Sequence, residues 1–148
     1  MVYNLLAGPE ITLRTSPWGY VDIRDAAAQM IAGIKVTGKH RLLSVGPWFD
    51  NKEAVEYITS IRPDLKDRLV NVVSTNQKRP LADPSTASKV LGLPEPIPWR
   101  QTVADTLEAI LKVEKEWTEK GTDIKDLKEN GILQFQIDAG SCDVVFTD

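Results

Sequence analysis

The segment that most constrains the fold of this chain runs from residue 19 to residue 27 and reads GYVDIRDAA. Tyr20 to Ile23 has the short apolar pattern of a buried strand. Asp25 follows, and its carboxylate can accept hydrogen bonds from the open amides of a first helical turn. Apolar residues then recur at helical spacing, namely Ala27, Met30, Ile31 and Ile34. The segment therefore predicts a strand that leads into a helix over residues 25–34.

Similar patterns along the chain predict a small sheet covered by helices. Strands are expected over Arg41–Val45 and Leu69–Val73, in addition to Tyr20–Ile23. Helices are expected over residues 51–61 and 100–119. At the start of the first helix, Asp50 and Glu53 have the spacing of a capping box. Residues 132–147 alternate apolar and polar side chains after a short charged helix, so we expect a β-hairpin there. The fold class predicted is α/β or α+β, with a small, partly parallel sheet, packed helices and a C-terminal β-hairpin.

Length and composition narrow the class of protein. The 148 residues are enough for one domain with a real core, and 42% hydrophobic with 26% charged residues is typical of a soluble protein. The net charge of −3, with basic residues spread along the chain, argues against a nucleic-acid partner. The apolar runs are too short to cross a membrane, and the single cysteine, Cys142, forms no internal disulfide. We expect a cytoplasmic protein without a metal site.

Four ordered blocks resemble a known enzyme family. They are Gly19–Asp25, the GKHRLLS stretch over residues 38–44, Asp83–Leu93 with its Ser-Lys and Leu-Gly pairs, and Trp99–Glu116. Together, over residues 4–120, they resemble the C-terminal, substrate-binding lobe of extended short-chain dehydrogenase/reductases. The similarity is to fungal ketoreductase and dihydroflavonol-reductase-like members of the NAD-dependent epimerase/dehydratase family. The resemblance implies a lobe over residues 1–121 that lacks the Rossmann domain, and an additional helix and hairpin over residues 122–148 of the same domain.

The redox machinery of that family is missing from this chain. None of the nine glycines forms the Gly-rich turn that lets a backbone approach a pyrophosphate at a helix N-terminus. The family also uses a tyrosine whose pKa is lowered by a lysine one helical turn later. Neither Tyr3, Tyr20 nor Tyr57 has a lysine four residues on. We therefore expect no cofactor, and no hydride transfer by this chain alone.

In the family this lobe shapes the substrate pocket, which directs attention to loop aromatics and to isolated charged side chains. The candidate substrate-binding residues are Trp18, Tyr20, Trp48 and Phe49, each of which can equally serve as core packing. The candidate catalytic residues, which would polarise the substrate, are His40 and Arg79. The alternative for both is an exposed, solvated side chain.

These observations leave two functions open. The first is a cofactor-independent isomerase or cyclase, pericyclic reactions included, acting on a small apolar secondary metabolite in a cavity derived from a fungal reductase. The second is a non-catalytic ligand- or partner-binding module of the same descent. A homodimer is expected in either case, because a lobe without its neighbour exposes apolar surface.

Overall fold

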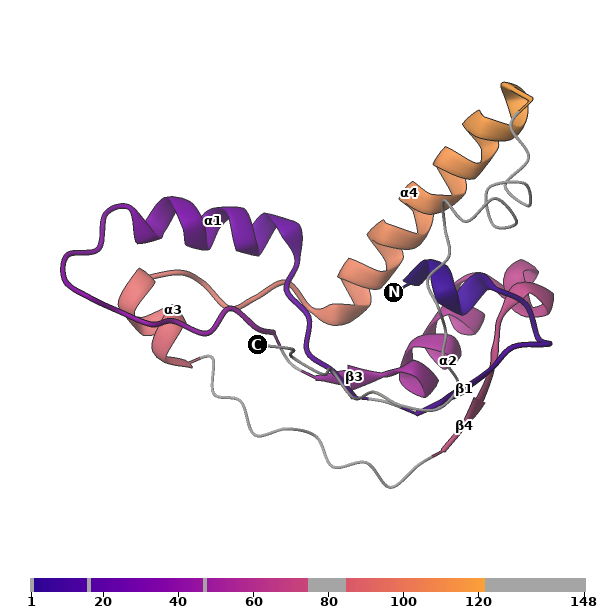
Figure 1. The fold of residues 1–148 in the computed structure, drawn as a ribbon, viewed down its shortest axis with the longest axis horizontal. Helices are drawn as coiled ribbons and strands as arrows, with labels where there is room; N and C mark the ends of the chain where they lie inside the picture. Colours follow the sequence, from indigo (N-terminus) through magenta and orange to yellow (C-terminus); the bar gives the residue numbers. More distant parts are fainter. Residues whose placement is uncertain (1, 16, 47, 75–84, 122–148) are drawn as a thin grey trace, which may run out of the picture. The chain divides into compact units, whose positions relative to one another are not determined.

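The structure is a computed structural model that describes residues 2–15, 17–46, 48–74 and 85–121. The chain divides into two compact units, Met1–Glu108 and Ala109–Asp148. The described elements are η1 (Val2–Leu6), β1 (Thr12–Arg14), β2 (Pro17–Trp18), α1 (Ile23–Gly33), β3 (Phe49–Asp50), α2 (Asn51–Ile61), η2 (Pro63–Arg68), β4 (Asn71–Val73), α3 (Ser85–Leu91) and α4 (Trp99–Glu119) (Figure 1). The turns of α4 up to Glu108 belong to the first unit and its remaining turns to the second.

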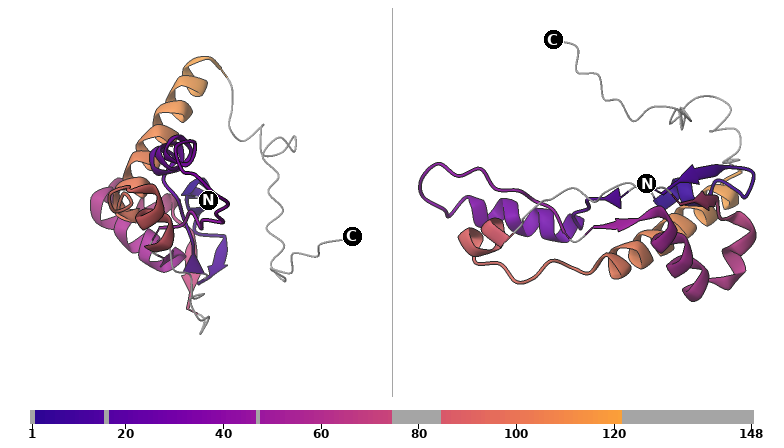
Figure 2. Two further views of the ribbon diagram at one scale, coloured as in Figure 1. Left: turned by 90° about the vertical axis from the view of Figure 1, so that its left-hand side faces the viewer. Right: turned by 90° about the horizontal axis from the view of Figure 1, so that it is seen from below.

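Two short sheet pieces form the β-structure of the described residues. β1 pairs with β4 in parallel, with Leu13 opposite Val72, and β2 pairs with β3 in antiparallel orientation. The 3-10 helices η1 and η2 and the helix α2 gather around β1 and β4 (Figures 1 and 2). The predicted fold class, helices packed with a small and partly parallel sheet, is confirmed. The predicted hairpin over residues 132–147 lies outside the described residues.

The helix α2 has the boundaries and the N-terminal capping box that the sequence predicts. The side chain of Asp50 accepts a hydrogen bond from the amide of Glu53, and the Glu53 carboxylate accepts one from the amide of Asp50, both over 2.9 Å. This reciprocal capping box satisfies amides that have no partner inside the helix. The apolar stripe of α2 then buries Ala54 and Ile58 completely. Local chemistry and burial agree, so the boundaries 51–61 are as predicted.

Two of the three predicted strands are wrong. Residues 20–23 and 41–45 form no β-ladder with each other. The backbone hydrogen bond between these two parts of the chain runs from the amide of Gly46, just after the second segment, to the carbonyl of Tyr20. A strand is defined by continuous pairing with a neighbour, and one hydrogen bond does not supply it. The third strand shortens from Leu69–Val73 to Asn71–Val73. The helix expected over 25–34 starts earlier, at Ile23, because Asp22 rather than Asp25 is its N-cap.

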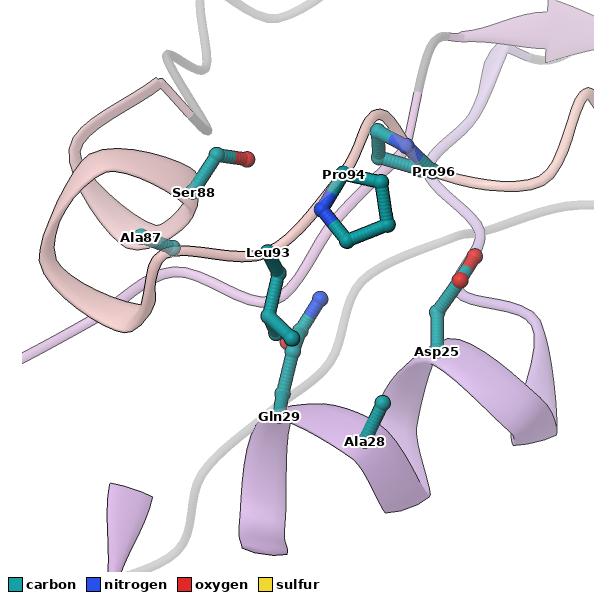
Figure 3. A pocket seen from close by; sticks show the side chains of 8 residues that line it. All are labelled: Asp25, Ala28, Gln29, Ala87, Ser88, Leu93, Pro94 and Pro96. Carbon is teal, nitrogen blue, oxygen red and sulfur yellow. The ribbon is translucent and has the colours of Figure 1, made fainter. Parts of the chain in front are cut away.

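The apolar face of α1 was expected to pack on the sheet, and this prediction is also wrong. Its large side chains, including Met30 and Ile31, are exposed to solvent, and α1 has no buried residue. The side of α1 that carries Ala28 and Gln29 instead faces α3 and the connector between α3 and α4 (Figure 3). Periodicity identifies an amphipathic helix, but it does not identify what covers the apolar side.

Candidate functional site

Two of the predicted substrate-binding aromatics, Tyr20 and Phe49, are part of a buried aromatic cluster. The ring of Phe49 is 1% exposed and stacks on Trp99, with centroids 4.8 Å apart and an angle of 9°. The Tyr20 ring meets Phe49 edge-on at 5.6 Å, and the Tyr57 ring meets Trp99 in the same way at 5.5 Å. Such offset and edge-on pairs are the favourable geometries for aromatic packing. Tyr20 and Phe49 therefore lie inside the domain.

The two predicted tryptophans lie beside this cluster. Trp18 is in β2, where the antiparallel register sets it opposite Phe49. The ring of Trp48 lies so close to Gly19 that a Cβ there would be 2.9 Å from it. Sequence reasoning missed Trp99 and Tyr57 as members of this cluster. Both sit on helix faces, and only their helical spacing signals that they point inward.

The phenol of Tyr20 is held as a neutral hydrogen-bond donor. Its oxygen donates to the backbone carbonyl of Ile97 over 2.6 Å. Burial, and then the nearby carboxylates of Asp25 and Asp22, raise the pKa of Tyr20 to about 12. A short-chain reductase needs its tyrosine pKa lowered, so this shift runs in the opposite direction. Tyr20 is therefore structural near neutral pH.

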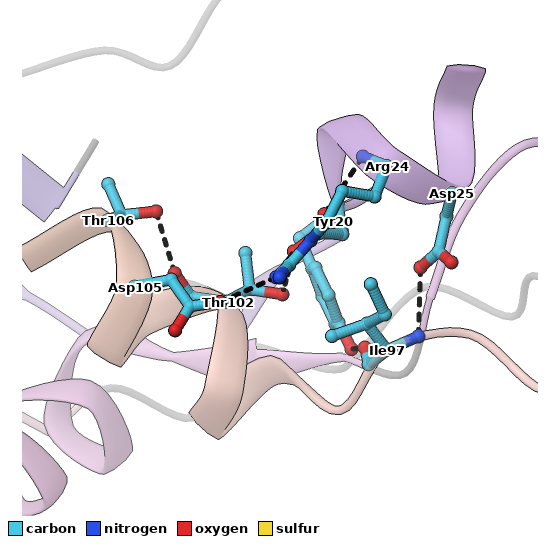
Figure 4. A network of polar contacts seen from close by, with 8 residues as sticks. Tyr20, Arg24, Asp25, Ile97, Thr102, Asp105 and Thr106 are labelled. Carbon is cyan, nitrogen blue, oxygen red and sulfur yellow. Dashed lines mark hydrogen bonds and ion pairs between the residues drawn. The ribbon is translucent and has the colours of Figure 1, made fainter. Parts of the chain in front are cut away.

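A polar network joins the start of α1 to the start of α4 (Figure 4). The buried carboxylate of Asp22 accepts from Nε of Arg24 over 2.8 Å, from its Nη2 over 2.9 Å, and from Oγ1 of Thr102 over 2.8 Å. The hydrogen bonds from Arg24 are the largest cause that holds the pKa of Asp22 well below its usual range. Arg24 also reaches Asp105 over 2.7 Å. The network fixes the start of α1 against the start of α4.

Of the two predicted catalytic residues, the structure describes His40. His40 is exposed on the loop after α1, and its Nε2 lies 3.1 Å from the carbonyl oxygen of Thr37 in the same loop. Gly38 gives that loop its turn with a φ of +98°. Arg79 lies outside the described residues. His40 as a polarising group stays a prediction, with its ring bonded locally.

An apolar groove runs along α1. It measures about 500 Å³ and is open to solvent. Its lining comes from α1 and the loop after it, and from the end of α3 and the connector; the residues are Ala28, Ile31, Ala32, Lys35, Val36, Leu91 and Leu93. Lys35 supplies the one cation of that lining. The small side chains of Ala28 and Ala32, one helical turn apart, leave the space.

A smaller hollow of about 40 Å³ adjoins the groove and shares Ala28 and Leu93 with it (Figure 3). It has room for about one or two waters. At its edge the amide of Ile97 donates to the Asp25 carboxylate over 2.8 Å. Pro94 and Pro96 line one side of this smaller hollow, and their rings fix the backbone φ of that wall.

Within the described ranges no three histidine, cysteine, aspartate or glutamate side chains come together as a metal site would require. A search of the same residues finds no helix with the length and apolar character to cross a membrane.

Comparison with known proteins shows the fold alone. No protein-family model and no curated protein matches the chain. Gre2 from Candida albicans in complex with NADPH matches at a TM-score of 0.62 and 24% identity, covering 75% of this chain and 35% of that one. Yeast methylglyoxal/isovaleraldehyde reductase Gre2, complexed with NADPH, matches at 0.62 and 21%, covering 77% and 39%. This chain thus spans little more than a third of these reductases and shares the fold of that part of them.

Proposed function

We propose that this chain binds a small apolar molecule in the groove beside α1, on a fold derived from a reductase. The observation that carries the proposal is the groove itself. Its volume of about 500 Å³ falls within the range of roughly 300–1,000 Å³ that small-molecule sites occupy. Its walls are branched aliphatic side chains, including Ile31, Val36 and Leu93. Burial of a ligand there removes apolar surface from water on both partners.

The rest of the described domain favours binding over redox chemistry. A nicotinamide dinucleotide places its pyrophosphate at a helix N-terminus. The N-termini of α1 and α2 are already capped by the carboxylates of Asp22 and Asp50, whose negative charge opposes a phosphate there. The residues present therefore do not fit the cofactor of the structurally similar reductases. The small carbonyl compounds in the yeast enzyme's name support a small ligand for this chain as well.

A cofactor-free isomerase or cyclase acting on a fungal secondary metabolite is the second candidate, and it needs the same groove. Lys35 favours it, because an ammonium group beside apolar walls stabilises negative charge that develops on a bound substrate. His40 lies on the loop that follows Lys35 and is the second group that such a reaction would use. Binding without turnover is the simpler function, since two of the residues predicted to hold a substrate, Tyr20 and Phe49, pack against each other and Phe49 stacks on Trp99.

The test uses the uncharged fluorescent probe N-phenyl-1-naphthylamine and the full chain. Ala32→Trp fills the groove without removing a packed side chain, and Val113→Trp on α4 adds the same indole at a residue that is not part of the groove lining. We expect saturable probe fluorescence and a raised Tm for the wild type and Val113→Trp, and loss of both for Ala32→Trp. Equal binding by the two variants would place the site elsewhere. Ala28→Leu serves as a second, milder filling variant, and saturable NADPH binding would overturn the proposal.

A further inference from the structure

The face of α1 opposite Asp25, Ala28 and Gln29 carries an apolar seam that is exposed in the described part of the chain. We call the residues Ile23, Ala27, Met30 and Ile34 the α1 seam. Ile23, Met30 and Ile34 are 82%, 76% and 84% exposed, values far above those of ordinary helix residues of this size. Their intervals of four, three and four residues are the a/d spacing of a helix that packs along a second helix.

The seam points away from the part of the domain that α1 contacts. At about 100° per residue, its centre lies roughly 180° around the helix from Asp25, Ala28 and Gln29, which face the connector. No charged residue lies on the seam itself. The nearest arginine, Arg24, is held to Asp22 and Asp105 by hydrogen bonds on the flank of the helix. An apolar stripe of this kind marks a surface that another helix covers.

We propose that the α1 seam binds the α1 seam of a second copy of this chain, with the two helices antiparallel about a twofold axis. A twofold contact sets residue i against j and j against i. Antiparallel pairing then sets Ile23 against Ile34 of the second copy and Ala27 against Met30 of the second copy. At the centre of the contact, the large side chain of Met30 faces the small side chain of Ala27 of the second copy, so the α1 seam is complementary to itself.

The length of α1 sets the strength of this contact. Eleven helical residues span about 16 Å, and a pair of such helices buries roughly 800 Å² in total. That area lies below the roughly 1,200 Å² of stable specific interfaces, so the dimer forms and dissociates with protein concentration. We expect a dissociation constant of about 1–100 µM.

Sedimentation velocity of the full chain over about 1–200 µM tests the contact. The wild type should shift from monomer to dimer, and Met30→Asp should raise the dissociation constant at least about tenfold by burying a carboxylate in the seam. Val113→Asp on α4, where the side chain is 41% exposed, is the matched control and should leave dimerisation unchanged. Ile34→Lys, just past the helix end, repeats the test at a second position, with circular dichroism as the check on folding.

A wild type that stays monomeric overturns the proposal, and so does a dimer that Met30→Asp and Ile34→Lys leave intact. A monomer whose seam amides are protected from hydrogen exchange assigns the seam to another segment of the same chain, which also overturns it. Orientation is tested in a Cys142→Ser background. Mixed chains carrying Ile23→Cys and Ile34→Cys should form the mixed disulfide in preference to the Ile23→Cys homodimer. The reverse preference excludes the antiparallel arrangement.

Discussion

The phenol of Tyr20 donates a hydrogen bond of 2.6 Å to the carbonyl of Ile97, 77 residues further along the chain. The amide of the same residue donates to Asp25, so both polar groups of Ile97 are satisfied by the segment that begins α1. Two side chains within six residues of each other thus hold the connector in place. The groove depends on this attachment, because the connector carries Leu93 into its lining.

Removal of the Tyr20 hydroxyl should weaken that attachment. Tyr20→Phe leaves the Ile97 carbonyl without its partner, and we expect the free energy of unfolding in urea to fall by about 1–2 kcal/mol. Tyr57→Phe is the control, since Tyr57 makes its described contacts through its ring. A loss of the same size in both variants would contradict a specific role for the Tyr20 hydroxyl.

Alkaline titration should report on the same phenol. Its pKa is raised to about 12 in the folded state from an unfolded value of about 10, so the native state holds its proton more tightly. The resulting stability is complete below pH 10 and is lost as the pH rises from about 10 to 12. Tyr20→Phe should flatten the decline of unfolding free energy in that window. An unchanged slope would contradict the raised pKa.

Asp22 should control stability in acid. Its folded pKa is lowered, so the unfolded state binds the proton more readily, and the stability that Asp22 contributes is present above the unfolded pKa of about 3.9. This contribution is lost as the pH falls below that value. Asp22→Asn should therefore be less stable at pH 7 and show a shallower acid decline. Asp67→Asn, an exposed substitution in η2, is the control.

Two glycines in different surroundings should respond in opposite ways to an added methyl group. A Cβ at Gly46 would lie 2.8 Å from the Tyr20 ring, whereas nothing lies within 4 Å of a Cβ at Gly33. Gly46→Ala should lower the Tm, because the ring is buried and cannot move aside. Gly33→Ala at the end of α1 should be neutral or stabilising by up to about 1 kcal/mol. Equal effects would contradict the close approach of Gly46 to Tyr20.

Phe49 should be the most costly side chain to truncate. Phe49→Ala removes a fully buried ring from between Tyr20 and Trp99, and we expect a loss of about 3–5 kcal/mol in unfolding free energy. Leu43→Ala, at a half-exposed position on the loop before β3, should change it by less than about 0.5 kcal/mol. A small loss for Phe49→Ala would argue that the ring lines a cavity, as predicted for a substrate contact.

Local sequence signals predicted α2 correctly. The predictions around α1 were wrong because they depend on contacts with residues distant in sequence. The capping box of Asp50 and Glu53 acts within four residues, so its chemistry is complete in the sequence. The strands expected over 20–23 and 41–45 depend on partners elsewhere, and the described contact between them is a single hydrogen bond from Gly46. Asp22 and Asp25 were both possible N-caps of α1. Thr102 donates a hydrogen bond to Asp22 and the amide of Ile97 donates one to Asp25, and both partners are distant in sequence.

The groove was missed for a related reason. Ala28 and Ala32 look like ordinary helix formers, and the gap that they leave exists only because Leu91 and Leu93 return beside them. The aromatic candidates were identified by type, yet Phe49 proved to be core because Trp99 stacks on it from a helix 50 residues later. Residue type therefore limits the candidates for a binding site, but tertiary contacts determine which of them are core residues.

The three prolines at positions 94, 96 and 98 have a consequence for how a ligand meets the groove. Each fixes its own φ, so the connector surrenders little conformational freedom when the domain folds and has almost none left to lose afterwards. If the proposed ligand binds beside Leu93, it would meet a connector whose backbone is already restricted. The entropic cost of ordering the protein on binding would then be small.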